Sequence, residues 1–449
     1  MLLGTLILSW PAFLNRFPLL FPDSMTYIEG GRLIARRLFL HETSSYYGMR
    51  SRIYALGIFP FHRNLIMWPV AALQALIAAY VIWLVVRSIV TRQTILSYLV
   101  LCAVLSLLTS VSWYTVLILP DILGPVFYLC VYLIVFARES LSRTERVLLM
   151  VIMWWTVASH GSHMVVAIGL CALLILLLAF RSRIMQHRRR AVVTVIAILM
   201  ITAATQIGLN AFLTGTPSLN GDWPPVLMAR IIVDGPGRQY LETHCPDAKF
   251  ALCEDVHNLP DTADDFLWSD KGIWPSASDE KRVQLQREEM RFVIATVRAY
   301  PLEQLKKSAA NFGNQLITLG LDDLGSNGWV LNEFDSEMPG QKSIYQHSRQ
   351  IRDALPLKFF SSVQEWTVIA SLIMIAAFIP YVWRSRPTRI LGMGVIVISA
   401  VVMNALVTGI LSGVETRYQS RVIWLLPLLA GILFLNWREH GSLGRSNAE

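Results

Sequence analysis

The chain has 449 residues, of which 54% are apolar and 16% are charged, and its mean hydropathy is +0.49. Soluble globular domains are about 25% charged, so this composition excludes an ordinary soluble protein and favours a membrane protein with several spanning helices. The formal net charge is +8. No basic patch is interleaved with aromatic residues, so no nucleic-acid partner is expected.

Ten apolar stretches reach or approach the length of about 20 residues that a helix needs to cross a bilayer. They are residues 2–15, 65–86, 94–113, 115–137, 147–160, 163–180, 191–213, 362–383, 390–411 and 421–437. The first has neither a basic start nor a small-residue cleavage site, so we expect it to remain as a span. The predicted fold class is an all-α polytopic membrane protein with about ten transmembrane helices.

One long polar region, residues 214–360, separates spans seven and eight and holds every lysine and 21 of the 31 acidic residues. The stretch 278–300 predicts a helix capped by Ser278 or Asp279, and Pro301 begins a second helix. Because residues 220–245 are rich in turn formers, we expect a mixed extracytoplasmic domain here. The predicted division is an N-terminal bundle (1–213, with a first outer loop and interfacial helix in 15–64), this domain (214–360), and C-terminal helices with a short cytoplasmic tail (361–449).

The distribution of arginines between the connectors predicts the orientation of the spans. One set of connectors holds 15 arginines and the opposite set holds nine, so the first set is placed in the cytoplasm. Both termini are then cytoplasmic and the long polar region is periplasmic, in a bacterial inner membrane. Two of the five cysteines, Cys245 and Cys253, lie in that region, and an oxidising compartment makes them a plausible disulfide.

The first outer loop contradicts the usual charge bias, because it carries seven arginines and only three acids. Either an anionic ligand compensates these arginines, or they extend toward lipid headgroups. Residues 24–40 have the periodicity of a helix lying in the membrane interface, with Ser24 as a candidate cap and Asp23 at its positive end. A capping role alone explains Asp23 or Ser24 without any function.

Other polar residues fall on the same predicted side of the membrane, where ionisable groups are functional candidates. They are Asp121 in "LILPDILGP", His160 and His163 in "ASHGSHM", and Glu415, Arg417, Tyr418 and Arg421 in "GVETRYQSR". Each also has a structural explanation: a cap for Asp121, a polar turn for the histidines and interface anchors for the arginines. A metal at the histidines would need a third ligand that the sequence does not identify.

The layout resembles the GT-C superfamily of polytopic glycosyltransferases, which use polyprenyl-phosphate-linked sugars at the outer face of the membrane. The similar features are "PDSMTYIEGG" after the first span, "YYGMRSRIYALGIFPFH" before the second, an acid near the third and fourth spans, and "ETRYQSRVIWLLPLLAGIL" near the end. "PDS" has no neighbouring second acid and "LPDILG" is not an Asp-x-Asp motif, so a metal-dependent version is in doubt. No cofactor is assigned, and a divalent cation is left open.

The resemblance implies roles for these residues. Asp23 would be the catalytic base with Asp121 assisting, giving inversion at the sugar. The candidate donor-phosphate ligands are Arg50, Arg52, Arg417 and Arg421, and the candidate substrate-orienting residues are Tyr27, His160, His163, Glu415 and Tyr418. The implied partners are a lipid-linked sugar donor, membrane lipids, and a lipid, glycan or protein acceptor.

Three other readings remain open. A transporter or flippase would be expected to show internal repeats and polar residues near the bilayer midplane. An acyltransferase using His160 or His163 would need these residues on the opposite side of the membrane. A non-catalytic assembly factor that binds a partner through the polar region is not excluded by any residue.

Overall fold

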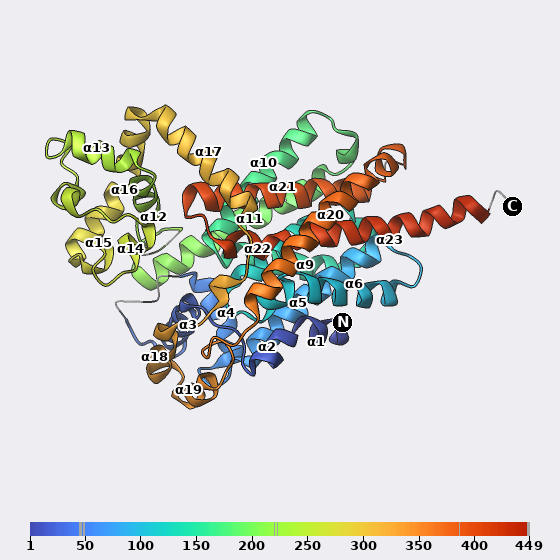
Figure 1. Cartoon of the computed structure of the whole chain (residues 1–449), viewed down its shortest axis with the longest axis horizontal. Coiled ribbons are helices and arrows are strands. Elements are labelled where there is room, and N and C mark those ends of the chain that lie inside the picture. The colour runs from blue at the N-terminus through green and yellow to red at the C-terminus, as the bar shows by residue number, and fades with distance from the viewer. Residues whose placement is uncertain (45–46, 48–49, 220, 222, 386, 447–449) are drawn as a thin grey trace. The chain divides into compact units, whose positions relative to one another are not determined.

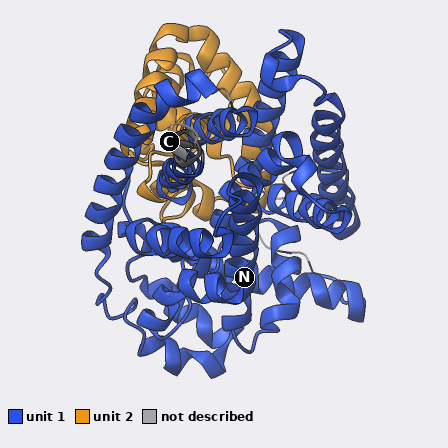
Figure 2. Ribbon diagram, turned by 90° about the vertical axis from the view of Figure 1, so that its right-hand side faces the viewer, with its two compact units in different colours: residues 1–219, 319–404, 419–449 blue, residues 220–318, 405–418 orange. Residues whose placement is uncertain are grey.

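The computed structural model of the chain describes residues 1–44, 47, 50–219, 221, 223–385 and 387–446. The structure is 78% helix, and the described residues form no strand, so the all-α prediction is confirmed. Figure 1 shows this helical architecture along the chain. The contacts divide the chain into two compact units, which Figure 2 colours separately: unit 1 is Met1–Leu219, Leu319–Asn404 and Gln419–Glu449, and unit 2 is Asn220–Thr318 and Ala405–Tyr418.

Unit 1 begins with the helices of the first half of the chain. These are α1 (Leu2–Leu8), α2 (Trp10–Asn15), α3 (Pro22–Leu40), α4 (Arg52–His62), α5 (Trp68–Ile89), α6 (Thr94–Leu108), α7 (Val111–Val116), η1 (Pro120–Ile122), α8 (Leu123–Phe136), η2 (Arg138–Ser140), α9 (Arg143–Ala158), α10 (Gly161–Ala179), η3 (Arg183–Met185) and α11 (Arg189–Thr214). The later helices of unit 1 are η5 (Asp322–Leu324), α18 (Gly328–Glu337), α19 (Pro339–Gln346), α20 (Leu357–Ser385) and α23 (Leu425–Ser446). Two helices, α21 (Thr388–Leu411) and α22 (Thr416–Ile423), have residues in both units.

Six helical segments in the described part of the chain are long and apolar enough to cross a membrane, so the protein is a multi-pass membrane protein. They are Trp68–Ile89, Gly161–Ala179, Arg189–Thr214, Leu357–Ser385, Thr388–Leu411 and Thr416–Glu439. The other expected spans fall on shorter helices. The first is broken at Ser9 into α1 and α2, and the fourth is broken between α7 and η1. A total of ten spans therefore stays a prediction.

Unit 2 is built from short helices around two longer ones. They are α12 (Val226–Val233), α13 (Pro236–His244), η4 (Ala251–Asn258), α14 (Ala263–Leu267), α15 (Ile273–Ser276), α16 (Asp279–Ala299) and α17 (Pro301–Ile317). The described residues of this unit are helical, so the expectation of a mixed domain is wrong. The apolar run at 226–233 forms a helix because its buried side chains, such as Met228 and Ile232, recur with helical spacing. The Glu289 carboxylate accepts the amide hydrogens of Leu227 and Met228 at its start.

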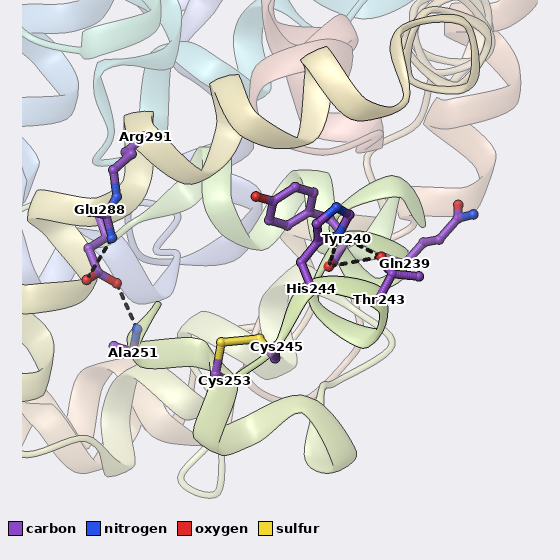
Figure 3. Close-up of a disulfide and its surroundings, with 9 residues drawn as sticks. All are labelled: Gln239, Tyr240, Thr243, His244, Cys245, Ala251, Cys253, Glu288 and Arg291. Atoms are coloured by element: carbon purple, nitrogen blue, oxygen red, sulfur yellow. Dashed lines mark hydrogen bonds and ion pairs between the residues drawn. A yellow bond between two sulfur atoms is a disulfide. The ribbon is translucent and has the colours of Figure 1, made fainter. Parts of the chain in front are cut away.

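The sequence located the two long helices of unit 2 well. The Ser278 hydroxyl caps α16 by accepting the amide hydrogen of Lys281, as expected, and Pro301 is the first residue of α17. Cys245 and Cys253 are joined in a disulfide, which Figure 3 shows between α13 and η4. Residues 319–360, which were assigned to the extracytoplasmic segment, belong by their contacts to unit 1.

The arginine-rich connectors assigned to the cytoplasm contact one another in unit 1. Arg87, at the end of α5, forms a two-bond ion pair with Glu145 in the first turn of α9, at 2.8 Å for each bond. Arg389 of α21 donates to the Ser88 carbonyl at 2.7 Å. These helix ends therefore lie on one side of unit 1, as a common membrane face requires.

The first outer loop holds most of its arginines by internal contacts. Three of the seven pair with carboxylates: Arg32 with Glu337, Arg36 with Glu42, and Arg50 with Asp23. Glu337 lies about 300 residues further along the chain than Arg32, so the sequence does not reveal it as an acid of this loop. Asp23 and Glu42 belong to the loop itself, and Glu337 is the acid among these three that reduces the excess of arginine from outside the loop.

Glu337 connects the late segment of unit 1 to the first loop. Its carboxylate is only 4% exposed and accepts two bonds from Arg32, at 2.8 and 3.1 Å. The Asn64 amide also donates to it, at 3.2 Å. Burial raises the pKa of the neighbouring Glu29 carboxyl, and the charge of Glu337 adds to this effect.

We predict that Glu337→Ala lowers the stability of the folded protein by about 2 kcal/mol, because Arg32 and Asn64 lose their shared acceptor. Asp335→Ala is the matched control, since Asp335 lies on the same helix and pairs with Lys342 at a mostly exposed site. Thermal unfolding in detergent should show a clear fall in Tm for the first variant and almost none for the second. Equal shifts would contradict the assigned role.

His62, the last residue of α4, makes the stability of the folded protein depend on pH. It is 1% exposed, and burial lowers the pKa of its imidazole from 6.5 to about 4. The unfolded chain therefore binds a proton between these values while the folded chain does not. The contribution of His62 to the free energy of unfolding should be fully present above about pH 6.5. It should decrease by up to about 3 kcal/mol as the pH falls to about 4, and change no further below that. Melting curves of His62→Asn across this range should show a smaller pH slope than the wild type.

Candidate functional site

Two Pro-Asp turns lie side by side in unit 1. Residues 17–21 connect α2 to α3 without helical structure, and Leu19 forms a parallel bridge with Leu117. The Leu19 amide donates to the Val116 carbonyl at 3.0 Å, and the Ile118 amide donates to the Leu19 carbonyl at 2.9 Å. Four residues after each bridged leucine the chain reaches an aspartate, in "LLFPD" and in "LILPD". Asp23 and Asp121 consequently occupy equivalent positions, each second in a helix that begins with proline.

The expected helix of the first loop starts two residues earlier than predicted. Phe21 is its extended N-cap residue and Pro22 its first helical residue, so Ser24 is not the cap. The Ser24 hydroxyl instead lies in the first turn and accepts the amide hydrogen of Phe21 at 3.0 Å. This arrangement leaves the Asp23 carboxylate in the first turn of α3, where the helix dipole favours a negative charge.

Asp23 is held by Arg50. The Arg50 guanidinium donates to its carboxylate at 2.6 Å, and both side chains are about 15% exposed. The adjacent Ser51 hydroxyl caps α4 and donates to the Ala158 carbonyl at the end of α9, at 2.7 Å. The Asp23–Arg50 pair is therefore fixed beside the turn that carries His160, while part of its surface still meets solvent.

The second pair, Asp121–Arg421, is buried. Its nitrogen–oxygen distance is 3.2 Å, and the two side chains are at most 5% exposed. Arg421 of α22 also donates to the Ser162 hydroxyl and to the Asn404 amide oxygen, at 3.2 and 3.1 Å. A charge pair this deeply buried stabilises only when its remaining hydrogen-bonding groups are also satisfied, and these two neighbours help to meet that need.

The histidines form part of the same cluster. His160 caps α10 by accepting the amide hydrogen of Ser162 at 3.2 Å. The His163 ring lies 5.4 Å from the His160 ring, and its Nδ1 donates to the Thr156 carbonyl at 2.8 Å. Nε2 of His163 is then a bare acceptor, buried and without a partner among the described residues, and a Cβ atom at Gly124 would lie 3.0 Å from it.

Tyrosines connect the two Pro-Asp turns. The Tyr27 ring packs edge-on against Tyr54 at 4.8 Å, and the Tyr54 hydroxyl donates to Gln74 at 2.6 Å. Burial raises the pKa of the Tyr54 phenol, and the nearby Tyr27 and Asp121 act in the same direction. Gln74 in turn donates to the Leu117 carbonyl at 2.7 Å, so this chain of contacts runs from α3 to the break before Asp121.

The other predicted site residues lie elsewhere. Arg52 is buried at the start of α4 and donates to the Asn210 amide oxygen at 2.7 Å. Glu415, Arg417 and Tyr418 belong to unit 2. There the Arg417 guanidinium lies 5.3 Å from the Tyr418 ring, and the backbone of Glu415 bonds to the Gln315 amide. Unit 1 therefore brings together Asp23, Arg50, Tyr27, Asp121, Arg421 and both histidines.

Several residues of the cluster were missed from the sequence, namely Tyr54, Gln74, Ser162 and Asn404. Gln74 and Asn404 did carry a signal, because an amide inside an apolar span is costly and must find a partner. A second signal was the repeat of Leu-x-x-Pro-Asp at 19–23 and 117–121. Tyr54 and Ser162 lie within the quoted stretches "YYGMRSRIYALGIFPFH" and "ASHGSHM", but their residue types did not distinguish them from their neighbours.

An apolar cleft of about 570 Å³ lies between α6, α20 and α23 in unit 1. Its walls include Leu101, Val104, Trp366, Met374 and Pro427. No group of three or more acidic, histidine or cysteine side chains that could hold a metal ion occurs among the described residues. The cluster around the two Pro-Asp turns offers carboxylates, guanidinium groups, imidazoles and hydroxyls.

Comparison of the chain with protein-family models, with curated proteins and with solved structures gives no match. The site itself can perform two tasks. A partly exposed carboxylate can take a proton from a hydroxyl group, and a guanidinium beside it can bind a phosphate oxygen.

We predict that Asp121→Ala or Arg421→Ala alone lowers the stability by about 3 kcal/mol or more, because each leaves a buried charge without its partner. The double replacement Asp121→Leu with Arg421→Met should recover much of this loss, since no charge is then buried. Melting temperatures of the two single variants and the double variant in detergent give the comparison. A double variant as unstable as the sum of the single ones would contradict the pairing.

Proposed function

We propose that the chain is a membrane glycosyltransferase, which moves a sugar from a polyprenyl-phosphate donor to an acceptor hydroxyl with inversion at the anomeric carbon. The observation that carries this proposal is the partly exposed Asp23–Arg50 pair, at a Pro-Asp turn that the Leu19–Leu117 bridge aligns with the turn of the buried Asp121–Arg421 pair. This pairing offers a base and a phosphate ligand next to one another, which is the chemistry of the GT-C superfamily that the sequence resembles.

The reaction needs little more than these groups. The oxygen of the acceptor hydroxyl attacks the anomeric carbon while the Asp23 carboxylate takes the proton of that hydroxyl. The bond from that carbon to the phosphate oxygen breaks, and the phosphate leaves with the electron pair. Arg50 stabilises the negative charge on the departing phosphate, and its release from Asp23 on donor binding frees the carboxylate to act as the base.

The remaining parts have supporting roles. Tyr27 and His163 lie close to the two pairs and would orient the sugar or the acceptor. The Nε2 acceptor of His163 is suited to a hydroxyl group. The apolar cleft between α6, α20 and α23 would hold part of the prenyl chain, because its walls are almost entirely hydrocarbon.

We place this site at the outer face of a bacterial inner membrane, with both termini in the cytoplasm. Two observations support this orientation. The disulfide of unit 2 suits an oxidising compartment, and helix ends of unit 1 from the larger arginine set contact one another, as expected if they share the cytoplasmic face. Unit 2 would then be periplasmic.

Asp23→Asn should retain binding of a polyprenyl phosphate but lose transfer by a factor of about 10³ or more, because the amide cannot take a proton. Arg50→Ala should weaken lipid-phosphate binding about tenfold, and Arg50→Lys should restore part of it, since the positive charge returns. Both can be measured on the purified full chain, binding with the lipid phosphate alone and transfer with lipid-linked hexoses and pentoses.

Arg36→Ala is the matched control, because Arg36 lies on the same helix and pairs with Glu42 at an exposed position. It should bind and transfer like the wild type. A wild-type protein that does not bind the lipid phosphate would remove the basis of the proposal and favour a transporter or an assembly factor.

A further inference from the structure

Helix α17 of unit 2 packs its polar face inside the unit and exposes its apolar face. Its sequence "PLEQLKKSAANFGNQLI" places Leu302, Leu305, Ala309, Phe312 and Leu316 at spacings of three and four residues, which form one apolar stripe. A polar stripe of Gln304, Ser308, Asn311 and Gln315 lies roughly a third of a turn further around the helix. In a soluble domain the apolar stripe would face the core.

The polar stripe is the one that packs inside unit 2. Gln304 and Asn311 each donate to the buried Asp234 carboxylate, at 2.9 Å. Gln315 is completely buried, and its amide bonds to both the carbonyl and the amide hydrogen of Glu415, at 2.8 and 2.9 Å. These bonds fix the rotation of α17 about its own axis, so its orientation follows from specific contacts.

The apolar stripe is consequently turned outward. Leu302 is 70% exposed and Leu305 is 65% exposed, and Ala309 is exposed as well. Ile317 at the end of the helix is 78% exposed. The preceding helix α16 repeats the feature, because its Met290, Ile294 and Val297 are exposed on the side away from its buried Leu285 and Phe292.

The C-terminal half of α17 is fastened to the end of a membrane-spanning helix. A Cβ atom at Gly409 of α21 would lie 2.8 Å from the Asn311 carbonyl oxygen and 3.0 Å from the Gln315 side chain, so the two helices touch there through backbone. Gly409 is two residues from the end of α21, which is apolar enough to cross the bilayer. This contact places the C-terminal half of α17 beside the last residues of that span.

From the outward apolar stripe and this attachment we propose that α17 is an interfacial helix whose Leu302, Leu305 and Ala309 are inserted into the membrane surface. A helix at the end of a span meets the boundary between headgroups and acyl chains, where apolar side chains enter the hydrocarbon. Lys306 follows Leu302 by four residues, so it borders the stripe, and its exposed, flexible side chain can reach phosphate groups. The partner of this face is therefore the bilayer, and the inference is independent of the transfer chemistry proposed above.

The test uses the full-length protein in nanodiscs of phosphatidylcholine and phosphatidylglycerol. A small fluorophore is attached to the cysteine of the variant Leu305→Cys and, in a second variant, to that of Leu302→Cys. The nanodiscs contain lipids that carry a nitroxide either near the headgroup or deep in the acyl chain. The free cysteines of the described chain are buried, so the unsubstituted protein gives the background labelling. Two controls complete the set: Glu242→Cys on the exposed side of α13, and Leu372→Cys on the 49% exposed lipid-facing part of α20.

We expect both α17 labels to lose more than about half of their fluorescence with the shallow nitroxide and less with the deep one. The α20 label should respond more strongly to the deep nitroxide, and the α13 label to neither. Quenching of the α17 labels by aqueous iodide alone would show that the stripe faces water and overturn the proposal. Protection from both iodide and lipid nitroxides would show that protein covers the stripe, through another part of the chain or a second copy, and would overturn it equally.

Discussion

The extended segment between α2 and α3 carries backbone groups that no helix satisfies, within a unit whose other backbone bonds are mostly made inside helices. In a membrane protein such groups must find partners inside the protein, because lipid offers none. The bridge between Leu19 and Leu117 meets this requirement from one side. Gln350 meets it from another, since its amide bonds to both the Leu20 amide hydrogen and the Leu20 carbonyl.

This constraint determines where the two acids lie. Each break in the apolar stretches ends in Pro-Asp, and the bridge aligns the breaks in parallel, so both carboxylates emerge at matching points. Proline then begins the following helix in each case, which places both acids in a first turn. The surroundings nevertheless differ. Asp23 keeps access to solvent while Asp121 is enclosed with Arg421, and the proposed function gives the reacting role to the accessible acid.

Each unit encloses a carboxylate with polar partners. In unit 1 Asp121 pairs with Arg421, which also bonds to Asn404. In unit 2 Asp234 pairs with Arg230 and accepts from two amides of α17, while the apolar stripe of that helix stays outside the unit's own hydrophobic core. The second arrangement costs a soluble protein stability, but it becomes favourable when hydrocarbon rather than water covers the apolar face.

The sequence by itself determined the helical class, the membrane-spanning character, the two long helices of the polar region and the cysteine pair, because these depend on local periodicity, capping and spacing. It also singled out Asp23, Asp121, Arg421 and His163, since isolated charges next to apolar stretches are conspicuous. Only the tertiary structure decided their partners. Glu337 joins Arg32 across about 300 residues, Arg52 turns to Asn210, and Arg417 lies in unit 2. Such pairings depend on the packing of distant helices, and the pattern along one chain carries no record of which helices meet.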